Sequence, residues 1–361
     1  MYRDESSRQF PKCMPSDWVP PVPAWSGLMP YNGQLTVAYY GVQSPLGPNA
    51  EGVAGFRRWL ATSLSEAGDA VHCEFANYID VKGCYTWLCI GYWVDETQHA
   101  RWSASPAHQD YWEHSTCMDR GIGVFREVLS IPADRFETLQ SDKLERAGAA
   151  RVCPVLHGPI REHNYWGATR DRIAASGYDP LMSEAQGATS DALEGITLGR
   201  RVKVRAPHNL AIIRSGQVLE DLEGLEKQIY FDEIEPALRS GMDFLRDNPV
   251  ETGCLSCRLL GETDATGAPL PRTFGLAYFA SLKHLEEWAR NHPSHLRIFN
   301  RFIAMAGQLG GDIKLRLWHE VAVLPAQGQV FEYINCHPAT GLLAHARPDA
   351  YSTSHDSGVQ V

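Results

Sequence analysis

The sequence predicts an α+β fold in which two ferredoxin-like β-α-β-β-α-β units make one barrel-type domain. The order of strand-like and helical segments is the same in residues 36–145 and in residues 208–325. A few residues of the two segments also match at a constant offset. Such a unit buries one sheet face under its helices, so two units in one chain can cover each other's open faces. Two independent ferredoxin-like domains joined by a linker are the alternative.

The first unit begins with a strand over residues 35–43 (LTVAYYGVQ). A helix is expected over residues 52–65, where aromatic and leucine residues recur at helical spacing. Two β-rich runs, HCEFANYIDV and CYTWLCIGYWV, are separated by Lys82 and Gly83, which favour a hairpin turn. A polar segment with aromatic residues at intervals follows, and FREVLSIPADRF closes the unit as a strand.

The second unit repeats this order, with strands NLAIIRSGQ, CLSCRLL, RTFGLAYF and LRLWHEVAVLP and helices over residues 232–246 and 282–305. At an offset of 186 residues, Tyr92 matches Tyr278. At an offset of 193, Glu127 matches Glu320, whereas Arg126 falls on His319. The repeat is therefore weak at single residues and depends on the order of the elements.

Three further segments complete the chain. Residues 1–35 form an arm rich in proline, which excludes regular helix, but Trp18 and Trp25 favour an arm packed on the body over a disordered leader. Residues 146–207 connect the two units and begin with an aromatic segment that we expect to be an active-site loop. Residues 326–361 form a C-terminal extension.

Charge and composition exclude several classes of protein. The net charge of −10 argues against nucleic acid or an anionic membrane as the main partner, because both require a basic face. No segment approaches the roughly 18 apolar residues of a membrane span, and the N-terminus lacks the apolar core of a signal peptide. The nine cysteines are an odd number spread over a long chain, unlike a secreted disulfide framework. A cytoplasmic protein with reduced thiols is expected.

Two histidines lie three residues apart in the last helical segment. Pro293 favours the first turn of a helix, so a new helix is expected to start near His292, with His295 one turn inside. Phe299 and Phe302 follow His295 at helical spacing. A neutral imidazole among aromatic residues suits the proximal position of a haem iron. A core histidine bonded to the backbone is the alternative.

Zinc is the other metal to consider. Cys254 and Cys257 have the spacing of half a zinc site, but no second CxxC or HxxxH follows at a suitable distance. In a regular strand the two thiols would point to opposite faces. We therefore interpret them as packing residues.

Other polar residues could act on a substrate. His319 shares one face of its strand with Leu317 and Val321. It could serve as a general acid, or it could be structural. Ser215 lies near the end of an apolar strand without a GxSxG context, so it could bond a substrate or cap a turn. Arg170 and Arg172 could bind a haem propionate or a substrate hydroxyl, or pair with surface carboxylates.

Four motifs together carry a resemblance to a known family. HPSHLRIF and LRLWHEV, with IRSGQ and YWGATRDR upstream, resemble the haem-containing aldoxime dehydratases, which include the aliphatic and phenylacetaldoxime enzymes. The resemblance covers roughly residues 15–345. It implies a dimeric α+β barrel fold, a homodimer, and a haem b that in the ferrous state binds the nitrogen of an oxime. The implied reaction converts R–CH=N–OH to a nitrile and water.

The resemblance also implies roles for individual residues. The proximal iron ligand falls on His295, with His292 as reserve, and the distal histidine falls on His319. The distal serine falls on Ser215, and the distal arginine on Arg172 in preference to Arg170, which we assign to the haem edge.

Two other functions stay open for the same barrel. A haem peroxidase or chlorite-dismutase-like enzyme would keep the proximal histidine, and so would a non-catalytic haem-binding protein. The sequence does not distinguish an aliphatic from an aryl aldoxime.

Overall fold

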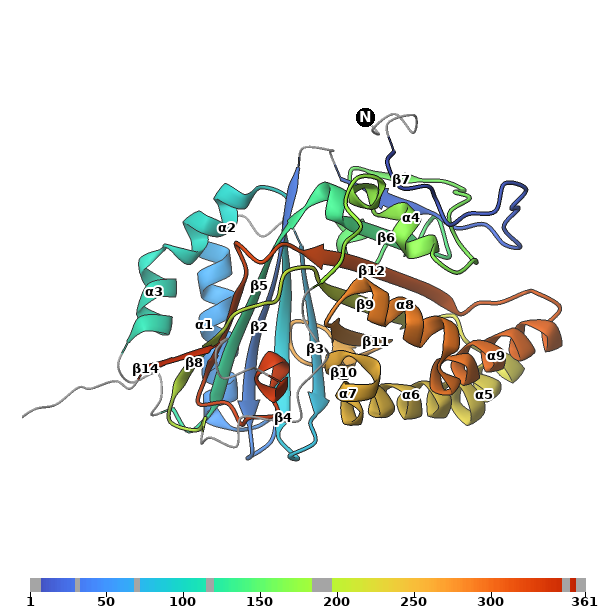
Figure 1. Cartoon of the computed structure of the whole chain (residues 1–361). Coiled ribbons are helices and arrows are strands. Elements are labelled where there is room, and N and C mark those ends of the chain that lie inside the picture. The colour runs from blue at the N-terminus through green and yellow to red at the C-terminus, as the bar shows by residue number, and fades with distance from the viewer. Residues whose placement is uncertain are drawn as a thin grey trace, which may run out of the picture.

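The computed structural model describes residues 8–29, 33–67, 72–114, 120–183, 197–345 and 351–354. The described chain has a mixed α+β fold built on one large antiparallel sheet of twelve strands, in the order β14-β8-β13-β5-β2-β4-β3-β10-β11-β9-β12-β6. A small second sheet pairs β1 (Ser26–Leu28) with β7 (Val155–His157). Figure 1 shows helices at both ends of the large sheet.

The first half of the sheet contains β2 (Gln34–Ser44), β3 (His72–Ile79), β4 (Tyr85–Trp93) and β5 (Gly123–Pro132). Its helices are α1 (Glu51–Ala67), α2 (Glu96–Ser103) and α3 (Pro106–Glu113). The strands lie in the order β5-β2-β4-β3, and Gly83 adopts the left-handed backbone that the expected hairpin turn requires. The order of elements predicted for this half is confirmed.

The second half contains β9 (Leu210–Val218), β10 (Cys254–Thr263), β11 (Pro269–Phe279) and β12 (Arg316–Leu324), in the order β12-β9-β11-β10. Between β9 and β10 lie α5 (Gly224–Ile229), a π-helical turn (Tyr230–Ile234), α6 (Glu235–Asp247) and α7 (Pro249–Thr252). Between β11 and β12 lie α8 (Leu282–Asn291) and α9 (Pro293–Gln308). The break at His292 confirms the predicted effect of Pro293.

Further strands, beyond the four of each half, extend the sheet at both edges. β6 (Phe136–Gln140) pairs with β12, although it follows β5 closely in the chain. β13 (Val330–Ile334), from the C-terminal extension, lies between β5 and β8 (Arg201–Val204), and β14 (Tyr351–Ser354) pairs with β8. The connecting segment also supplies α4 (Ala168–Arg172), which lies near β6 and β12 in Figure 1.

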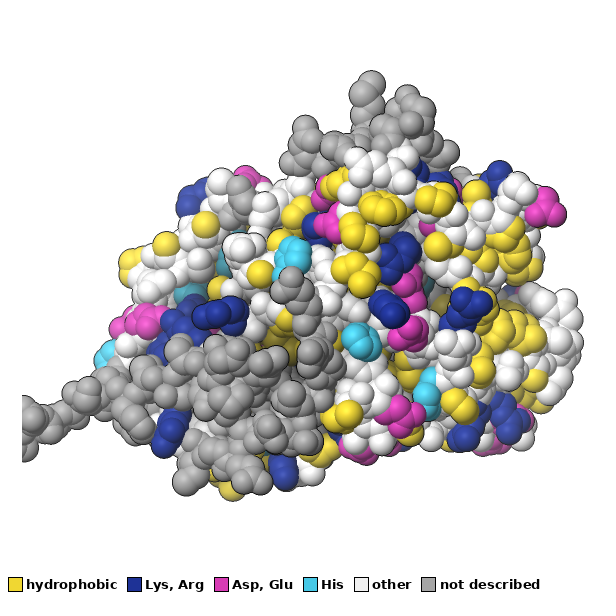
Figure 2. Space-filling model, in the orientation of Figure 1, with side chains coloured by type: hydrophobic (Ala, Val, Ile, Leu, Met, Phe, Trp, Pro, Cys, Tyr) yellow, Lys and Arg dark blue, Asp and Glu magenta, His cyan; other side chains and the backbone are white. Residues whose placement is uncertain are grey.

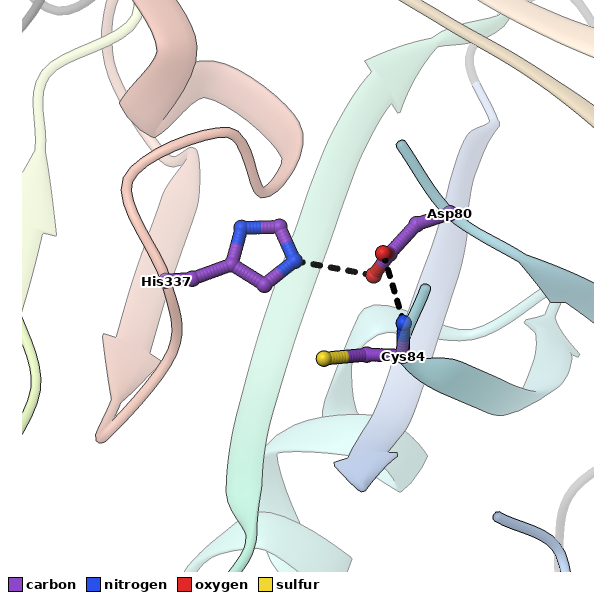
Figure 3. A group of neighbouring side chains, drawn as sticks. All are labelled: Asp80, Cys84 and His337. Carbon is purple, nitrogen blue, oxygen red and sulfur yellow. Dashed lines mark hydrogen bonds and ion pairs between the residues drawn. The ribbon is translucent and has the colours of Figure 1, made fainter. Parts of the chain in front are cut away.

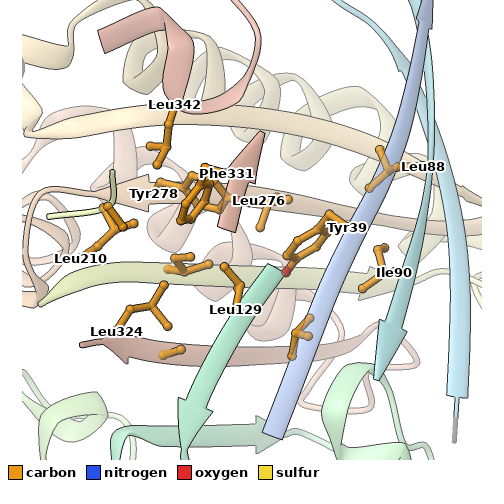
Figure 4. Close-up of a cluster of buried hydrophobic side chains, with 14 of the residues drawn as sticks. Tyr39, Leu88, Ile90, Leu129, Leu210, Leu276, Tyr278, Leu324, Phe331 and Leu342 are labelled. Atoms are coloured by element: carbon orange, nitrogen blue, oxygen red, sulfur yellow. The ribbon is translucent and has the colours of Figure 1, made fainter. Parts of the chain in front are cut away.

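The hydrophobic core has a central layer that both halves share. Figure 4 shows Tyr39 and Ile90 of the first half in the same cluster as Leu276, Tyr278 and Leu324 of the second. A separate cluster lies under α1, α2 and α3, and two more lie under the helices of the second half. The two sheet halves therefore pack against each other and carry their helices on the outer faces.

The predicted orientation of the two neighbouring cysteines is wrong. Cys254 pairs with Phe279 and Cys257 with Ala277, which lie on the same face of β11, because the register shifts between Cys254 and Ser256. An extra residue at such a bulge turns the strand so that both thiols enter one buried cluster. Their interpretation as packing residues agrees with this burial.

Candidate functional site

His295 lies in the first turn of α9 with its imidazole largely covered. The ring packs edge-on against Trp288, with ring centroids 4.8 Å apart. Its Nδ1 is buried and makes no hydrogen bond of normal geometry, although the carbonyl of Ala289 is near enough to favour the protonated ring. Burial outweighs that carbonyl and lowers the pKa of His295. The side chain is therefore a neutral imidazole whose buried Nδ1 has no hydrogen-bond partner among the described residues.

His292, the reserve candidate, is in a different situation. It caps α9: its Nδ1 accepts from the backbone N–H of Ser294 at 3.2 Å. Its Nε2 lies 3.1 Å from Glu251, and its ring packs on Phe244. A side-chain cap of this kind satisfies a backbone donor that the helix leaves free. Both ring nitrogens of His292 are thus engaged.

Ser215 and His319 lie directly opposite each other on β9 and β12. Opposite residues of an antiparallel pair project from the same face, with Cβ atoms about 5 Å apart. The next pair on this face is Ile213 and Val321, which belong to the same buried cluster as Trp288. The residue that packs on His295 therefore lies over the sheet face that carries Ser215 and His319.

Arg172 joins this group from α4. Its guanidinium NH2 group lies 2.8 Å from Nε2 of His319 and 3.0 Å from Glu137 Oε1, while its Nε donates to Glu137 Oε2 at 2.7 Å. Glu137 Oε1 also lies 3.1 Å from Nε2 of His319. The three side chains thus form a closed triangle around one ring nitrogen.

Glu137 is an ionised carboxylate in this triangle. Burial opposes its charge, but Arg172 and His319 outweigh burial and hold its pKa at about 2. Because an arginine can only donate, Nε2 accepts from Arg172 when it is unprotonated and donates to Glu137 when it is protonated. The triangle can therefore hold His319 in either protonation state.

Arg170, two residues before Arg172 in α4, points elsewhere. Its guanidinium binds Glu286 of α8 through two contacts of 3.0 and 2.7 Å, and it also donates to the carbonyl of Pro180. Of the two arginines, Arg172 is the one beside His319 and Ser215. Arg170 fastens α4 to α8.

The sequence prediction missed Glu137. It lies on β6, opposite Val321 of β12, one residue beyond the last strand predicted for the first half. The available signal was a lone glutamate alternating with Phe136 and Thr138, which does not separate a buried carboxylate from an exposed one. Only the pairing of β6 with β12 brings it to His319.

Comparison with known proteins identifies the family. The sequence pattern of the haem-containing dehydratases matches residues 38–342. The chain belongs to the haem-containing dehydratase family.

Individual relatives cover nearly the whole chain. An aliphatic aldoxime dehydratase of Rhodococcus globerulus is 37% identical over 94% of this chain and 95% of its own. A phenylacetaldoxime dehydratase of Bacillus sp. (strain OxB-1) is 32% identical over 92% of this chain and 94% of its own. The crystal structure of an aldoxime dehydratase in complex with butyraldoxime superposes with a TM-score of 0.86, at 37% identity over 94% of each chain. This dehydratase therefore shares its fold with a solved aldoxime dehydratase.

The residues of this haem-containing dehydratase fit its cofactor. A haem iron needs a neutral imidazole nitrogen that the protein does not use itself, which describes His295 and not His292. Ser215, His319 and Arg172 are polar groups that could serve a substrate of that haem, and His319 among them can exchange a proton. His295, Ser215 and His319 come from the second half, and Arg172 comes from α4 of the connecting segment.

A second group with metal-ligating side chains does not fit a metal. Asp80, Cys84 and His337 place their ligand atoms within 4.8 Å of one another (Figure 3). Nδ1 of His337 accepts the backbone N–H of Ala339 at 3.2 Å, so the ring proton is on Nε2, which donates to Asp80 at 2.8 Å. A protonated nitrogen cannot bind a metal. The group instead joins the turn between β3 and β4 to the C-terminal extension by a hydrogen bond.

The visible surface carries charges of both signs. Basic and acidic side chains are mixed over the visible face in Figure 2 and form no broad basic patch there. Among the described residues, no helix is both long and apolar enough to cross a membrane.

Proposed function

We propose that this haem-containing dehydratase converts aldoximes, R–CH=N–OH, to nitriles and water. The observation that carries the proposal is the triangle of Arg172, Glu137 and His319, with Ser215 opposite His319 on the neighbouring strand. Aldoximes are the substrates in the names of relatives that match over the whole length of the chain. A peroxidase does not require this paired serine and histidine.

The cofactor in this proposal is a haem b, ferrous during turnover, held by His295. When bound, the ferrous haem supplies an electron-rich metal site for the oxime nitrogen. Arg170 stays our candidate for the haem edge. Because its guanidinium binds Glu286, it would have to exchange that partner for a propionate.

His319 supplies the proton for the leaving group. Dehydration breaks the N–O bond and the C–H bond and forms the third bond between carbon and nitrogen. Hydroxide is a poor leaving group, so an acid must protonate it as the N–O bond breaks. When the ring carries both protons, Nε2 donates to Glu137 and the proton on Nδ1 passes to the oxime oxygen. The hydroxyl leaves as water.

Ser215 and Arg172 complete the arrangement. The Ser215 hydroxyl can bond the oxime oxygen and orient it toward His319. Once Nδ1 has given up its proton, Nε2 keeps its own and still donates to Glu137, which Arg172 holds through two contacts, so the neutral ring stays in place with Nδ1 unprotonated. That neutral ring is the base that takes the proton from carbon, so one histidine serves both transfers and is restored at the end. A positioned acid or base typically contributes about 10²–10⁴-fold to a rate.

We further propose that the two halves are duplicated ferredoxin-like units that close on each other as a barrel. The strand register supports this: Val37 pairs with Tyr92 and Leu129, and in the second half Ile212 pairs with Tyr278 and Ala322. These are corresponding positions. Asn77 and Gly261, which also correspond, pair with each other where β3 meets β10, as residues on a two-fold axis do.

Buried hydrogen bonds between the halves support the same two-fold relationship between them. The Tyr92 hydroxyl donates to Glu320 at 2.8 Å, and the Tyr278 hydroxyl donates to Glu127 at 2.6 Å. Each tyrosine thus binds the glutamate of the other half. An exchange of corresponding partners is typical of a symmetric interface.

The first half also has a counterpart of the haem ligand. His108 follows Pro106 at the start of α3, as His295 follows Pro293 in α9, and its ring packs on Trp102 at the same 4.8 Å. In the place of Ser215, however, the first half has Tyr40, whose hydroxyl lies 3.2 Å from Nε2 of His108. We therefore propose one haem per chain, in the second half. A cytoplasmic homodimer is proposed from the family resemblance alone.

The test is an anaerobic assay of the reduced, haem-loaded protein with one aliphatic and one aryl aldoxime. Nitrile formed without peroxide is the expected result. His295→Ala should abolish the Soret band, whereas His319→Ala should keep the band and lose turnover. The reverse pattern would overturn the residue roles, and peroxide-dependent oxidation without nitrile would favour a peroxidase.

A further inference from the structure

The N-terminal arm, residues 8–28, is fastened to the helical turn that carries Arg172. Asp171 is buried in α4, and its two carboxylate oxygens accept the backbone N–H groups of Cys13 and Met14, each at 2.9 Å. The hydroxyl of Tyr165 donates to the same carboxylate at 2.7 Å. Asp171 therefore joins the arm, the preceding loop and α4 at one point.

Trp18 makes a second attachment, a few residues along the arm. Its indole Nε1 donates to the carbonyl of His163 at 3.0 Å, and its ring packs edge-on against Tyr165 at 5.6 Å. Arg161 in turn donates to the carbonyl of Trp18 at 2.7 Å. An aromatic body with a satisfied polar group makes a rigid anchor. The arm thus holds the loop before α4 as well as α4 itself.

The contact between the arm and α4 is close. Gly167, just before α4, has a φ of 96°, and a Cβ added there would lie 2.6 Å from Cβ of Cys13. Only glycine allows this backbone and this approach. The arm therefore lies directly on the start of α4.

The segment held in this way positions the guanidinium at His319. Arg172 follows Asp171 directly, and its NH1 donates to the carbonyl of Glu162 at 2.5 Å, within the loop that Trp18 anchors. Its NH2 contacts Nε2 of His319. Both the backbone and the side chain of Arg172 are fixed through groups that the arm contacts.

We propose that the N-terminal arm, acting through Asp171, is a positioning element for the reaction at His319. The proposal rests on the proposed function, because it assigns the arm to the same proton-transfer site. Asp171 touches neither substrate nor cofactor in this proposal. It sets the place of Arg172, and a displacement of about 1 Å at such a group can cost about 10²-fold in rate.

Asp171→Asn tests the proposal in the full-length, haem-loaded protein. The asparagine amide keeps one acceptor oxygen and places an NH2 donor where the second oxygen accepted a backbone N–H of the arm. One of the two bonds to Cys13 and Met14 is therefore lost, and the arm should loosen. We expect kcat to fall about 10–100-fold, with an unchanged Soret band and a KM within about threefold of wild type. In an Arg172→Ala background the same change should alter kcat less than about twofold, because no guanidinium is left to position. Faster trypsin cleavage after Lys12 should report the released arm.

Asp264→Asn is the matched control. Asp264 also accepts two backbone N–H groups and one hydroxyl, in the turn between β10 and β11, and its substitution should leave kcat unchanged. If Asp171→Asn does not fold, Tyr165→Phe removes one of the three bonds and should lower kcat about two- to fivefold. Equal losses with and without Arg172, or a released arm with full turnover, would overturn the proposal. A wild-type protein that forms no nitrile would overturn the proposed function, while the cleavage assay would still report the arm.

Discussion

The hydroxyl of Tyr40 lies 3.2 Å from Nε2 of His108, inside the aromatic cluster of the first half. His108 is fully buried, and burial lowers its pKa to about 3, so it is a neutral imidazole like His295. It differs in having its Nε2 covered by a phenol. Three aromatic rings, those of Trp59, Trp102 and Trp112, also pack around the imidazole.

His108→Phe should therefore leave the haem content at one per chain and keep turnover. The change leaves the Tyr40 hydroxyl without this partner in a buried site, which should lower the free energy of unfolding by about 1–3 kcal/mol. Haem titration by absorbance and urea unfolding check the two effects. A loss of haem in this variant, with His295 intact, would contradict the assignment of the ligand to the second half.

Ser215→Ala should lower turnover without affecting haem binding. The serine is expected to orient the oxime oxygen, so its loss should cost about 10-fold or more in kcat, less than the about 10²–10⁴-fold expected for His319→Ala. Steady-state assays on both variants, with the Soret band as the haem measurement, give the comparison. Ser256→Ala is a control for removing a hydroxyl from a strand of the same sheet. A Ser215→Ala enzyme with wild-type kcat would exclude the serine from the reaction.

Glu137→Gln should change the stability of the protein in acid. The pKa of Glu137 is about 2 in the folded protein against an ordinary value of 4.5, so its contribution is present above pH 4.5 and is lost as the pH falls toward 2. This difference corresponds to about 3 kcal/mol. The free energy of unfolding of the wild type should therefore fall more steeply than that of the variant between about pH 5 and pH 3. Urea unfolding at each pH measures this free energy. If it falls equally with pH in the wild type and the variant, Glu137 is not held ionised by Arg172 and His319.

Arg170→Ala and Glu286→Gln together decide the role of Arg170. If Arg170 exchanges Glu286 for a haem propionate, Arg170→Ala should weaken haem binding about 5–10-fold. Glu286→Gln should then leave haem affinity unchanged or improve it, because it frees the guanidinium. Haem dissociation, followed by transfer to an acceptor protein, measures both. Equal effects of the two substitutions would limit Arg170 to bracing α4 on α8.

Tyr92→Phe and Tyr278→Phe should destabilise the protein by similar amounts. Each removes a hydroxyl that satisfies a buried glutamate of the other half, at an expected cost of about 1–3 kcal/mol. Arg214 also loses a partner in the first case, because it donates to the Tyr92 hydroxyl at 2.6 Å. Thermal and urea unfolding measure the losses. A marked effect of only one variant would argue against the corresponding roles of the two tyrosines.

The sequence predicted most of what depends on local patterns. Alternating apolar residues located the strands, and Pro293 located the start of α9 and hence the different situations of His292 and His295. The match of Tyr92 with Tyr278 and of Glu127 with Glu320 was visible as spacing, but spacing could not show that each tyrosine binds the other glutamate. That exchange depends on how the two sheet halves face each other.

What the sequence could not predict depends on distant pairing. Glu137 reaches His319 only because β6 pairs with β12 and not with its neighbours in the chain. The one-residue shift at Cys254 reverses the face of a thiol, and no composition signal marks it. Arg172 could be preferred over Arg170 only by resemblance. The two residues lie on one short helix, and they differ only in their tertiary partners, Glu286 for Arg170 and His319 for Arg172.

The position of β13 constrains the order in which the protein can assemble. Arg126 of β5 and Glu332 of β13 are hydrogen-bonded partners separated by 206 residues, and the whole second half lies between them in the chain. The first half therefore cannot complete its sheet until the second half has been synthesised. Until then, β5 has an unpaired edge that could join another chain. A fragment that ends before β13 would consequently tend to aggregate through this edge and would not be a smaller working enzyme.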